Sequence, residues 1–320
     1  MTTENTIKIF VGTEEEQILA VKVLEYSLRK HTKLPVEIKP LFVALREAGI
    51  QIPTPKDPQI RPQTPFSFQR FAIPALTGYQ GKAIYLDSDM QVFRDIQEIW
   101  SMPFHGADLL SVPEPPDSGR PPQFSVMLLN CEQLNWDAPE LVRQLAAGKW
   151  TYQQFVLEMA PAEKIAATLP LGWNDLERYE SEKTALTHYT DMPKQPWLNS
   201  QNPLGWLWCQ DLFNAVEDGF ITQEFIAAQV KKGWVRPSLL DQLQHNIIDP
   251  LQLPQKVIAK DKKEFIPPYA VKQQLQKITH DSKTPSLIKY LARQLYIFAR
   301  HLWQARAVQF ISRKLKRRYS

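Results

Sequence analysis

The sequence predicts an α/β domain with a mixed, mostly parallel sheet that is flanked by helices. Short apolar runs at residues 7–11, 84–86 and 126–129 are typical of strands buried on both faces. After the first run, apolar residues recur at helical spacing, and they are Ala20, Val21, Leu24 and Leu28. Strands that alternate with helices favour a layered α/β architecture.

The remaining elements follow from the same patterns. Further strands are expected at residues 36–38, 109–112 and 184–189. Helices are expected at residues 66–76, 138–147 and 151–160, and from about residue 207 onward. Proline-rich loops are expected at residues 51–65 and 113–122.

Length and composition limit the number of domains. The chain has 320 residues, of which 43% are hydrophobic, enough for a large core. We expect a main domain at residues 1–255 and a basic helical extension at residues 256–320. The two cysteines, Cys131 and Cys209, fit neither a metal-binding spacing nor a disulfide framework, so free thiols are expected. With no signal peptide and no long apolar run, a cytoplasmic protein is expected.

The net charge of +4 hides a basic C-terminal segment. No acidic residue follows Asp281, and residues 1–281 carry 28 basic against 34 acidic residues. The basic residues after Asp281 are Lys283, Lys289, Arg293, Arg300, Arg306, Arg313, Lys314, Lys316, Arg317 and Arg318. Residues 285–303 also form an amphipathic helical pattern. We expect residues 283–320 to attach to an anionic membrane surface, with packing on the protein's own body as the alternative. No nucleic-acid partner is expected.

Two aspartates, one residue apart, follow the apolar run at residues 84–86. Side chains two apart on a strand share a face, so Asp87 and Asp89 can point the same way at its carboxyl end. Open α/β sheets bind ligands at that end. Paired carboxylates there suit Mn²⁺ or Mg²⁺, which are usually shared with substrate phosphates. A solvated turn is the alternative for an isolated Asp-x-Asp pattern.

Other polar residues could join this pair, although each could also be structural. Arg70 could hold the acidic pair or a phosphate. His188 ends an expected strand, where an imidazole can complete a carboxylate site for Mn²⁺. Lys194 could neutralise a diphosphate as a point charge. Ser125, before an expected strand, would let a ligand approach the backbone closely.

Aromatic residues offer a further surface. Trp173 and Asn174 stand in an expected turn, where the ring could touch a sugar or pack in the core. Four tryptophans follow the histidine, and they are Trp197, Trp206, Trp208 and Trp234. Core packing is the simpler interpretation of these four, and a platform for an acceptor sugar is the alternative.

Common nucleotide-binding and hydrolase motifs are absent from the sequence. The eleven glycines form neither Gly-x-Gly-x-x-Gly nor Gly-x-x-x-x-Gly-Lys. The patterns His-Glu-x-x-His and Gly-x-Ser-x-Gly do not occur either. A nucleotidyltransferase would need a glycine- and arginine-rich loop after the first strand, where residues 12–16 are instead acidic.

Together, these segments resemble a bacterial glycosyltransferase of the GT-A fold, close to glycosyltransferase family 8. The resemblance covers roughly residues 7–210. It is carried by Phe-Gln-Arg-Phe-Ala-Ile-Pro at residues 68–74, Ile-Tyr-Leu-Asp-Ser-Asp-Met at 84–90, Val-Met-Leu-Leu-Asn at 126–130, Trp-Asn at 173–174 and His-Tyr-Thr at 188–190.

The resemblance implies a metal-dependent, retaining transfer of a hexose from a nucleotide sugar, usually linked to UDP. The implied metal ligands are Asp87, Asp89 and His188, with Mn²⁺ or Mg²⁺ as the ion. The residues expected at the nucleotide sugar are Gly12, Thr13, Arg70, Asp87, Ser88, Ser125 and Lys194. The acceptor would be a sugar, a glycolipid or a polysaccharide. A catalytically silent, membrane-associated scaffold of the same fold is the alternative.

Several positions depart from the family pattern. Gln17 stands where a tyrosine commonly stacks on the base, and Ser125 replaces a usual glycine. One residue is inserted between Lys194 and Pro196, so either Lys194 or Gln195 could face the phosphates. No carboxylate occurs at residues 151–154, so Gln154 is the expected group beneath the anomeric carbon, and Gln154 and Asp89 are the catalytic candidates. The lack of a carboxylate nucleophile favours front-face transfer, in which the leaving phosphate helps to deprotonate the acceptor.

Overall fold

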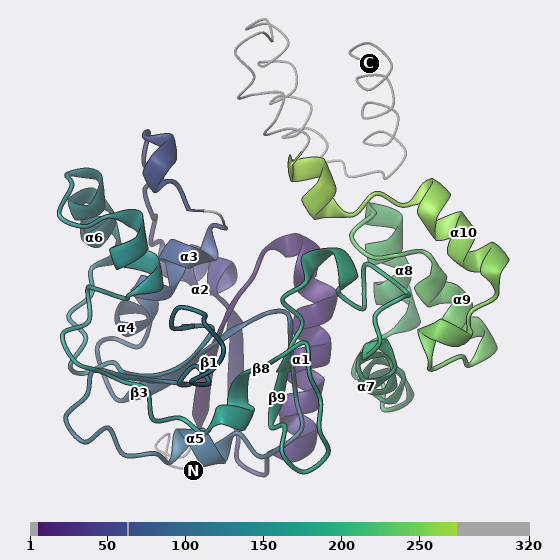
Figure 1. Ribbon diagram of the computed structural model, residues 1–320, viewed down its shortest axis with the longest axis horizontal. Coiled ribbons are helices and arrows are strands. Elements are labelled where there is room, and N and C mark those ends of the chain that lie inside the picture. Colours follow the sequence, from purple (N-terminus) through teal and green to yellow (C-terminus); the bar gives the residue numbers. More distant parts are fainter. Residues whose placement is uncertain (1–5, 63, 274–320) are drawn as a thin grey trace, which may run out of the picture. The chain divides into compact units, whose positions relative to one another are not determined.

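The computed structural model describes residues 6–62 and 64–273 of the chain (Figure 1). The chain divides after Thr190 into two compact units. The first unit has the predicted α/β class, with a mixed, mostly parallel sheet flanked by helices. The boundary expected after residue 255 stays a prediction. Residues 283–320, the expected membrane-binding segment, lie outside the described residues.

A six-stranded sheet, counted over the described residues, forms the centre of the first unit. Its strands, in spatial order, are β2 (Val36–Pro40), β1 (Ile7–Gly12), β3 (Lys82–Asp87), β6 (Val126–Asn130), β5 (Leu109–Ser111) and β7 (Ile165–Ala166). The pairs β1–β2, β1–β3 and β5–β7 are parallel, whereas β6 runs antiparallel to both of its neighbours. Five of these strands were expected from the sequence, and β7 was not.

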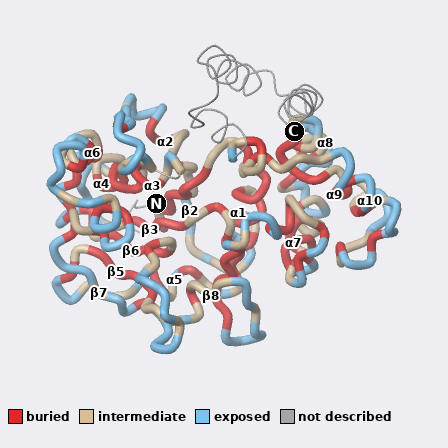
Figure 2. The backbone as a smooth tube through the Cα atoms, turned by 45° about the horizontal axis from the view of Figure 1, so that its top comes forward, coloured by how far each residue is buried: buried red, intermediate tan, exposed pale blue. Residues whose placement is uncertain are grey.

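Residue alternation along the strands divides the core into two layers, one on each face of the sheet. Phe10 and Tyr85 pack on the side covered by α2 (Leu41–Ala48), α3 (Phe66–Gln69) and α6 (Ala138–Ala146). Ile84 packs on the other side, together with α1 and α5. Their bounds are Ile18–His31 for α1 and Gln97–Trp100 for α5. In Figure 2, the backbone of β1 and β3 is drawn largely as buried, whereas parts of α6 are drawn as exposed. Neighbouring strand residues therefore face different layers, as expected for a sheet covered on both faces.

Short helical turns complete the first unit. The helix expected at residues 66–76 is a run of three turns, made of α3, η4 (Arg70–Ala72) and α4 (Ile73–Leu76). The helix expected at residues 151–160 is wrong in type, because the structure has a single π-helical turn, η5 (Gln153–Leu157). Phe155 within that turn packs against Phe68 and Phe71, at ring-centroid distances of 5.4 and 4.4 Å. The remaining turns are η2 (Glu15–Gln17), η3 (Pro58–Ile60) and η6 (Leu171–Asn174).

A small second sheet includes the strand that follows β3 in the chain. Its order is β4 (Met90–Val92), β9 (Leu186–His188) and β8 (Asp175–Leu176). Strands β4 and β9 are antiparallel, with Met90 opposite His188. The sequence predicted β9 but neither β4 nor β8, because strands of two or three residues are too short to show a period. This sheet joins segments that are about a hundred residues apart.

The second unit is helical within its described residues. Its elements are η7 (Met192–Lys194), α7 (Gly205–Glu217), α8 (Gln223–Lys232), α9 (Ser238–His245), η8 (Pro250–Gln252) and α10 (Gln255–Glu264). Trp197 and Trp208 are buried against each other, with ring centroids 5.6 Å apart. Both cysteines are buried free thiols, as the sequence predicted. No helix within residues 6–62 or 64–273 is both long and apolar enough to cross a membrane.

A fully buried arginine organises the core of the second unit. Arg236 donates hydrogen bonds to the Pro196 carbonyl oxygen at 2.9 Å, to Ser238 Oγ at 2.5 Å and to Gln242 Oε1. Ser238 in turn donates its backbone N–H to Asp261 Oδ1 at 3.0 Å. Burial lowers the pKa of Arg236, so its charge depends on these partners. This network links α9 to α10 by hydrogen bonds.

Replacing Arg236 by leucine should lower the free energy of unfolding by about 3 kcal/mol or more, because the buried Asp261 carboxylate would lose its compensating charge. The measurement is urea unfolding followed by tryptophan fluorescence. Lys256→Ala, an exposed change on α10, is the control and should alter stability by less than about 0.5 kcal/mol. Equal stability of the two variants would show that the network contributes nothing.

Candidate active site

The acidic pair stands where β3 ends and the backbone turns toward β4. Gly12 of β1 is opposite Asp87 in the parallel register. The backbone N–H of Ser88 donates to the Gly12 carbonyl oxygen at 3.1 Å, and that of Asp87 donates to the Ser125 carbonyl oxygen at 3.2 Å. The turn that carries Asp87 and Asp89 is therefore held by backbone hydrogen bonds on both sides.

Strand pairing brings His188 to this turn. Because Met90 is opposite His188, the preceding residue Asp89 reaches the end of β9. The backbone N–H of Tyr189 donates to the Asp89 carbonyl oxygen at 2.7 Å, and His188 Nε2 lies 3.1 Å from Asp89 Oδ1. One ligand atom from each of Asp87, Asp89 and His188 lies within 4.8 Å of the others. The structure thus brings together the three residues that the sequence analysis chose as metal ligands.

The second nitrogen of His188 has a partner of its own. His188 Nδ1 lies 3.0 Å from Oδ1 of Asn174, the last residue of η6. An amide oxygen can only accept, so Nδ1 carries the proton in this pair and donates it. In the neutral ring, Nε2 then has its lone pair available on the side of the aspartates. Asn174 therefore orients the imidazole as a ligand.

Asp87 is held from the opposite side by a tyrosine and an arginine. Tyr85 Oη donates to Asp87 Oδ1 at 2.5 Å, since residues two apart on β3 share a face. The Arg70 guanidinium stands over the Tyr85 ring, with Cζ 5.6 Å from its centroid. Arg70 also donates to the carbonyl oxygens of Ser67 and Phe124, at 3.1 and 3.2 Å. Those bonds fix a positive charge close to the acidic pair.

The pKa shifts show that this cluster is short of positive charge. Burial and the neighbouring Asp89 carboxylate raise the pKa of Asp87, and Arg70 offsets this only in part. Burial lowers the pKa of His188, but Asp89, through its charge and hydrogen bond, and Asp87 outweigh that effect, so the net shift is upward. Burial and Asp87 raise the pKa of Tyr85, which therefore stays a hydroxyl donor. Added positive charge would stabilise the ionised carboxylates.

Gln17 contributes a contact that the sequence analysis did not predict. Ser88 Oγ donates to Gln17 Oε1 at 2.9 Å, which ties η2 to the turn between the two aspartates. Gln17 is the residue that stands in place of the tyrosine expected from the family pattern. The departure therefore coincides with a specific hydrogen bond to the acidic turn.

The other residues expected to contact the nucleotide sugar differ in their contacts with this turn. Ser125 contacts it through its carbonyl oxygen, which accepts from the Asp87 N–H. Thr13 follows Gly12, is buried, and donates its hydroxyl to the Glu14 carbonyl oxygen at 3.1 Å. Their contacts with a ligand stay predictions.

Among the described residues, Gln154 makes no hydrogen bond to the acidic turn. Gln154 is exposed, and its Oε1 accepts from the backbone N–H of Thr151 at 2.9 Å. It precedes Phe155, which packs on the turns next to Arg70. Lys194 belongs to the second unit and forms a 2.7 Å ion pair with Asp191. Gln195 beside it is buried. The roles of Gln154 and Lys194 stay predictions.

Gly12 leaves room for the tyrosine that supports Asp87. A Cβ atom at residue 12 would lie 2.2 Å from Tyr85 Oη, far inside van der Waals contact. Gly12→Ala should therefore displace the Tyr85 hydroxyl from Asp87 and lower the free energy of unfolding by about 1–3 kcal/mol. Denaturant unfolding measures this change.

A double variant isolates the cause of that destabilisation. Gly12→Ala combined with Tyr85→Phe removes the atom that the new methyl group meets first. The double variant should lose less stability than the sum of the two single changes. Simple additivity would mean that the hydroxyl does not contact residue 12.

Part of the first unit matches a known protein family. Residues 8–154 match the family model described as Glycosyl transferase family 8. Protein CDI from Arabidopsis thaliana is 37% identical over 93 residues, which are 29% of this chain and 35% of that protein. The matching part thus spans about a third of the length of this curated relative.

Solved glycosyltransferase structures are similar at low sequence identity. The bifunctional WbbM matches with a TM-score of 0.49 and 16% identity, over 67% of this chain and 50% of that one. GlyE from Streptococcus pneumoniae TIGR4 matches with a TM-score of 0.48 and 17% identity, over 68% and 63% of the two chains. The galactosyltransferase LgtC, solved with donor and acceptor sugar analogs, matches with a TM-score of 0.47 and 11% identity, over 69% and 99%.

The family match covers the turn with Asp87 and Asp89, and the helical turns with Arg70. It ends before Asn174 and His188 in the chain, which the small sheet and η6 bring to the same turn. That the chain is of bacterial origin stays a prediction. Residues 8–154 therefore carry a glycosyltransferase family 8 domain, which confirms the resemblance to a GT-A glycosyltransferase drawn from the sequence.

Proposed function

We propose that the protein is a metal-dependent, retaining glycosyltransferase that moves a hexose from a nucleotide sugar, with UDP as the expected nucleotide, to an acceptor. The observation that carries this proposal is the convergence of ligand atoms of Asp87, Asp89 and His188 within 4.8 Å of one another. The two aspartates belong to the segment that matches the family. A catalytically inactive scaffold would have no need to keep three ligand atoms and the orienting Asn174 together.

The residues present fit a divalent cation. Two carboxylates and one imidazole are the donor set that Mn²⁺ accepts, and Mg²⁺ is the alternative ion. The upward shift in the pKa of Asp87, caused by burial and by Asp89, is the charge imbalance that a cation would relieve. A bound ion would act as a Lewis acid that neutralises the negative charge of a diphosphate.

The surrounding residues bind and orient. Arg70 donates two of its five N–H groups to carbonyl oxygens, which leaves donors for a phosphate oxygen. Tyr85 and Asn174 act as positioning residues, because the first holds Asp87 and the second holds His188. Gln17 fixes Ser88 between the two aspartates, so the donor meets a pre-organised turn.

We infer front-face transfer from the side chains of the η5 segment. Gln154 carries an amide, which cannot serve as the carboxylate nucleophile of a double displacement. In front-face transfer, the bond between the sugar and the phosphate breaks, and a phosphate oxygen takes the proton of the attacking acceptor hydroxyl. A covalent sugar–enzyme adduct detected by mass spectrometry at any side chain would contradict this mechanism.

Two further parts of the proposal rest on sequence alone. The first is that Lys194 neutralises the diphosphate. The second is that residues 283–320 attach the protein to an anionic membrane surface. Deleting residues 283–320 should move the protein from the membrane pellet to the supernatant at low salt. Full solubility of the intact chain under the same conditions would contradict the membrane attachment.

UDP with Mn²⁺ should raise the melting temperature of the protein by several degrees at ligand concentrations about a hundredfold above the dissociation constant. Differential scanning fluorimetry measures this shift. Asp89→Asn should abolish the part of the shift that needs Mn²⁺, because one charged ligand is lost. An equal shift in wild type and variant, or no shift with any of UDP, GDP and ADP, would favour the silent scaffold.

Asn174→Ala should weaken Mn²⁺ binding by about 10- to 100-fold, because the imidazole of His188 would lose the partner that sets its orientation. Isothermal titration calorimetry with Mn²⁺ measures the affinity directly. Gln97→Ala, which removes an exposed amide on α5, is the matched control and should bind as wild type does. Unchanged affinity in Asn174→Ala would show that the hydrogen bond to Nδ1 is irrelevant to the site.

A further inference from the structure

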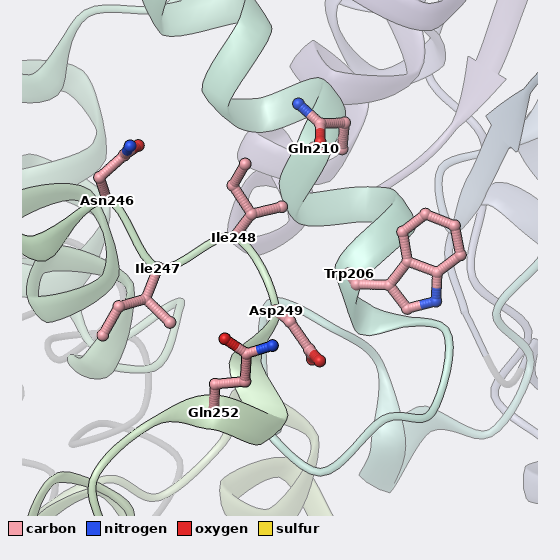
Figure 3. A pocket seen from close by; sticks show the side chains of 7 residues that line it. All are labelled: Trp206, Gln210, Asn246, Ile247, Ile248, Asp249 and Gln252. Carbon is pink, nitrogen blue, oxygen red and sulfur yellow. The ribbon is translucent and has the colours of Figure 1, made fainter.

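The second unit contains an open pocket with the chemistry of a saccharide site. It has a volume of about 590 Å³, within the range usual for small-molecule sites. Its lining includes Trp206, Gln210, Asn246, Ile248, Asp249 and Gln252. In Figure 3, α7 contributes Trp206 and Gln210, the loop after α9 crosses the view, and Gln252 follows on η8. We call this feature the Trp206 pocket.

Helix geometry explains why this tryptophan alone, of the four that follow the histidine, is exposed. Trp206 and Gln210 are four residues apart and share one face of α7. Trp208 lies on the opposite face and is buried against Trp197, and Trp234 is buried as well. Trp206 keeps 42% of its surface exposed. Three of the four rings are buried in the core, and the fourth, Trp206, lines the pocket.

The loop that lines the pocket is held rigidly from behind. Asn246 ends α9 in the left-handed region, with φ of 52°, which asparagine tolerates. The buried Gln242 donates its amide to the carbonyl oxygens of Ile247 and Ile248, at 2.7 and 3.2 Å. Asp249 Oδ1 accepts from the Leu251 N–H at 3.0 Å and caps η8. The pocket is therefore pre-formed, which lowers the entropic cost of binding.

Polar groups of the pocket lining are available to a ligand. Among the described residues, the side-chain amides of Asn246 and Gln252 make no hydrogen bond, and neither does the second carboxylate oxygen of Asp249. The Gln210 amide nitrogen donates to Asn214 at 3.0 Å, which leaves its oxygen as an acceptor. Among the described residues that line the pocket, Asp249 is the one that ionises, and its charge is negative. Phosphates and acidic ligands are disfavoured by that charge.

We propose that the Trp206 pocket binds a neutral saccharide, which rests on the proposed function because such a saccharide would be part of the acceptor or of the product glycan. The C–H face of a pyranose ring is apolar and packs on an indole, while its hydroxyls both donate and accept. The pocket lining meets these requirements together. Its amides can both donate and accept hydrogen bonds, its carboxylate accepts them, and its indole ring is flat. The ligand class of this pocket is then a neutral glycan.

Saturation-transfer-difference NMR on the full chain tests this proposal, with lactose, maltose and cellobiose as probes and with EDTA present and no nucleotide. At least one disaccharide should bind in the millimolar range. Trp206→Ala should weaken that binding by about tenfold. Trp206→Phe should restore part of it, because the aromatic surface is kept. Glucuronic acid should bind more weakly than glucose, because it would face Asp249.

Leu251→Ala is the matched control, since Leu251 is an exposed apolar residue of η8 that does not line the pocket. It should bind the disaccharide as wild type does. Failure of all three disaccharides to bind, or equal binding by wild type and Trp206→Ala, would overturn the proposal. Asp87→Asn should bind the disaccharide normally, so a failure of the metal site and a failure of this pocket are separate outcomes.

Discussion

The site depends on one electrostatic constraint, which is that two carboxylates share a small, partly buried space. Asp87 lies beside the like charge of Asp89, and burial makes the ionisation of Asp87 still more costly. The fold meets part of this cost with the Tyr85 hydroxyl, which donates to Asp87, and with the Arg70 guanidinium, which stands over the Tyr85 ring. These two groups offset the repulsion only partly, because the net shift in the pKa of Asp87 is still upward.

Strand direction decides which residues share that space. Because β6 runs antiparallel to β3, its beginning and not its end lies beside Asp87. Ser125 therefore contacts the acidic turn, while Asn130 pairs with Lys82 at the other end of the sheet. The antiparallel pairing of β4 with β9 then brings His188, which lies about a hundred residues further along the chain, to the acidic turn. The chemistry of the site is thus set by register as much as by residue type.

Much of this arrangement could be predicted from the sequence, and the remainder depended on tertiary contacts. The strand before Asp87 and the helix after the first strand are local patterns. His188 was chosen because it ends an expected strand, and the family resemblance then implied its role as a metal ligand. The bond from Ser88 to Gln17 left no signal, because these side chains meet only after folding. The bond from Tyr85 to Asp87 follows from their shared face on β3, but the sequence analysis did not predict it. The π-turn at Gln153–Leu157 was missed for a similar reason, because the packing of Phe155 on Phe71 overrides the local helical pattern.

The tryptophans of the second unit show the same division between pattern and packing. Counted along the chain, Trp197, Trp206, Trp208 and Trp234 form one cluster that could serve a core or a platform. The two-residue step from Trp206 to Trp208 turns the chain by about 200° on a helix, so only one of those rings can face the core. Burying Trp208 therefore obliges Trp206 to face outward, and Trp206 keeps 42% of its surface exposed. The exposed ring is thus a consequence of helical geometry. The proposed saccharide site combines this ring with the polar loop at residues 246–249.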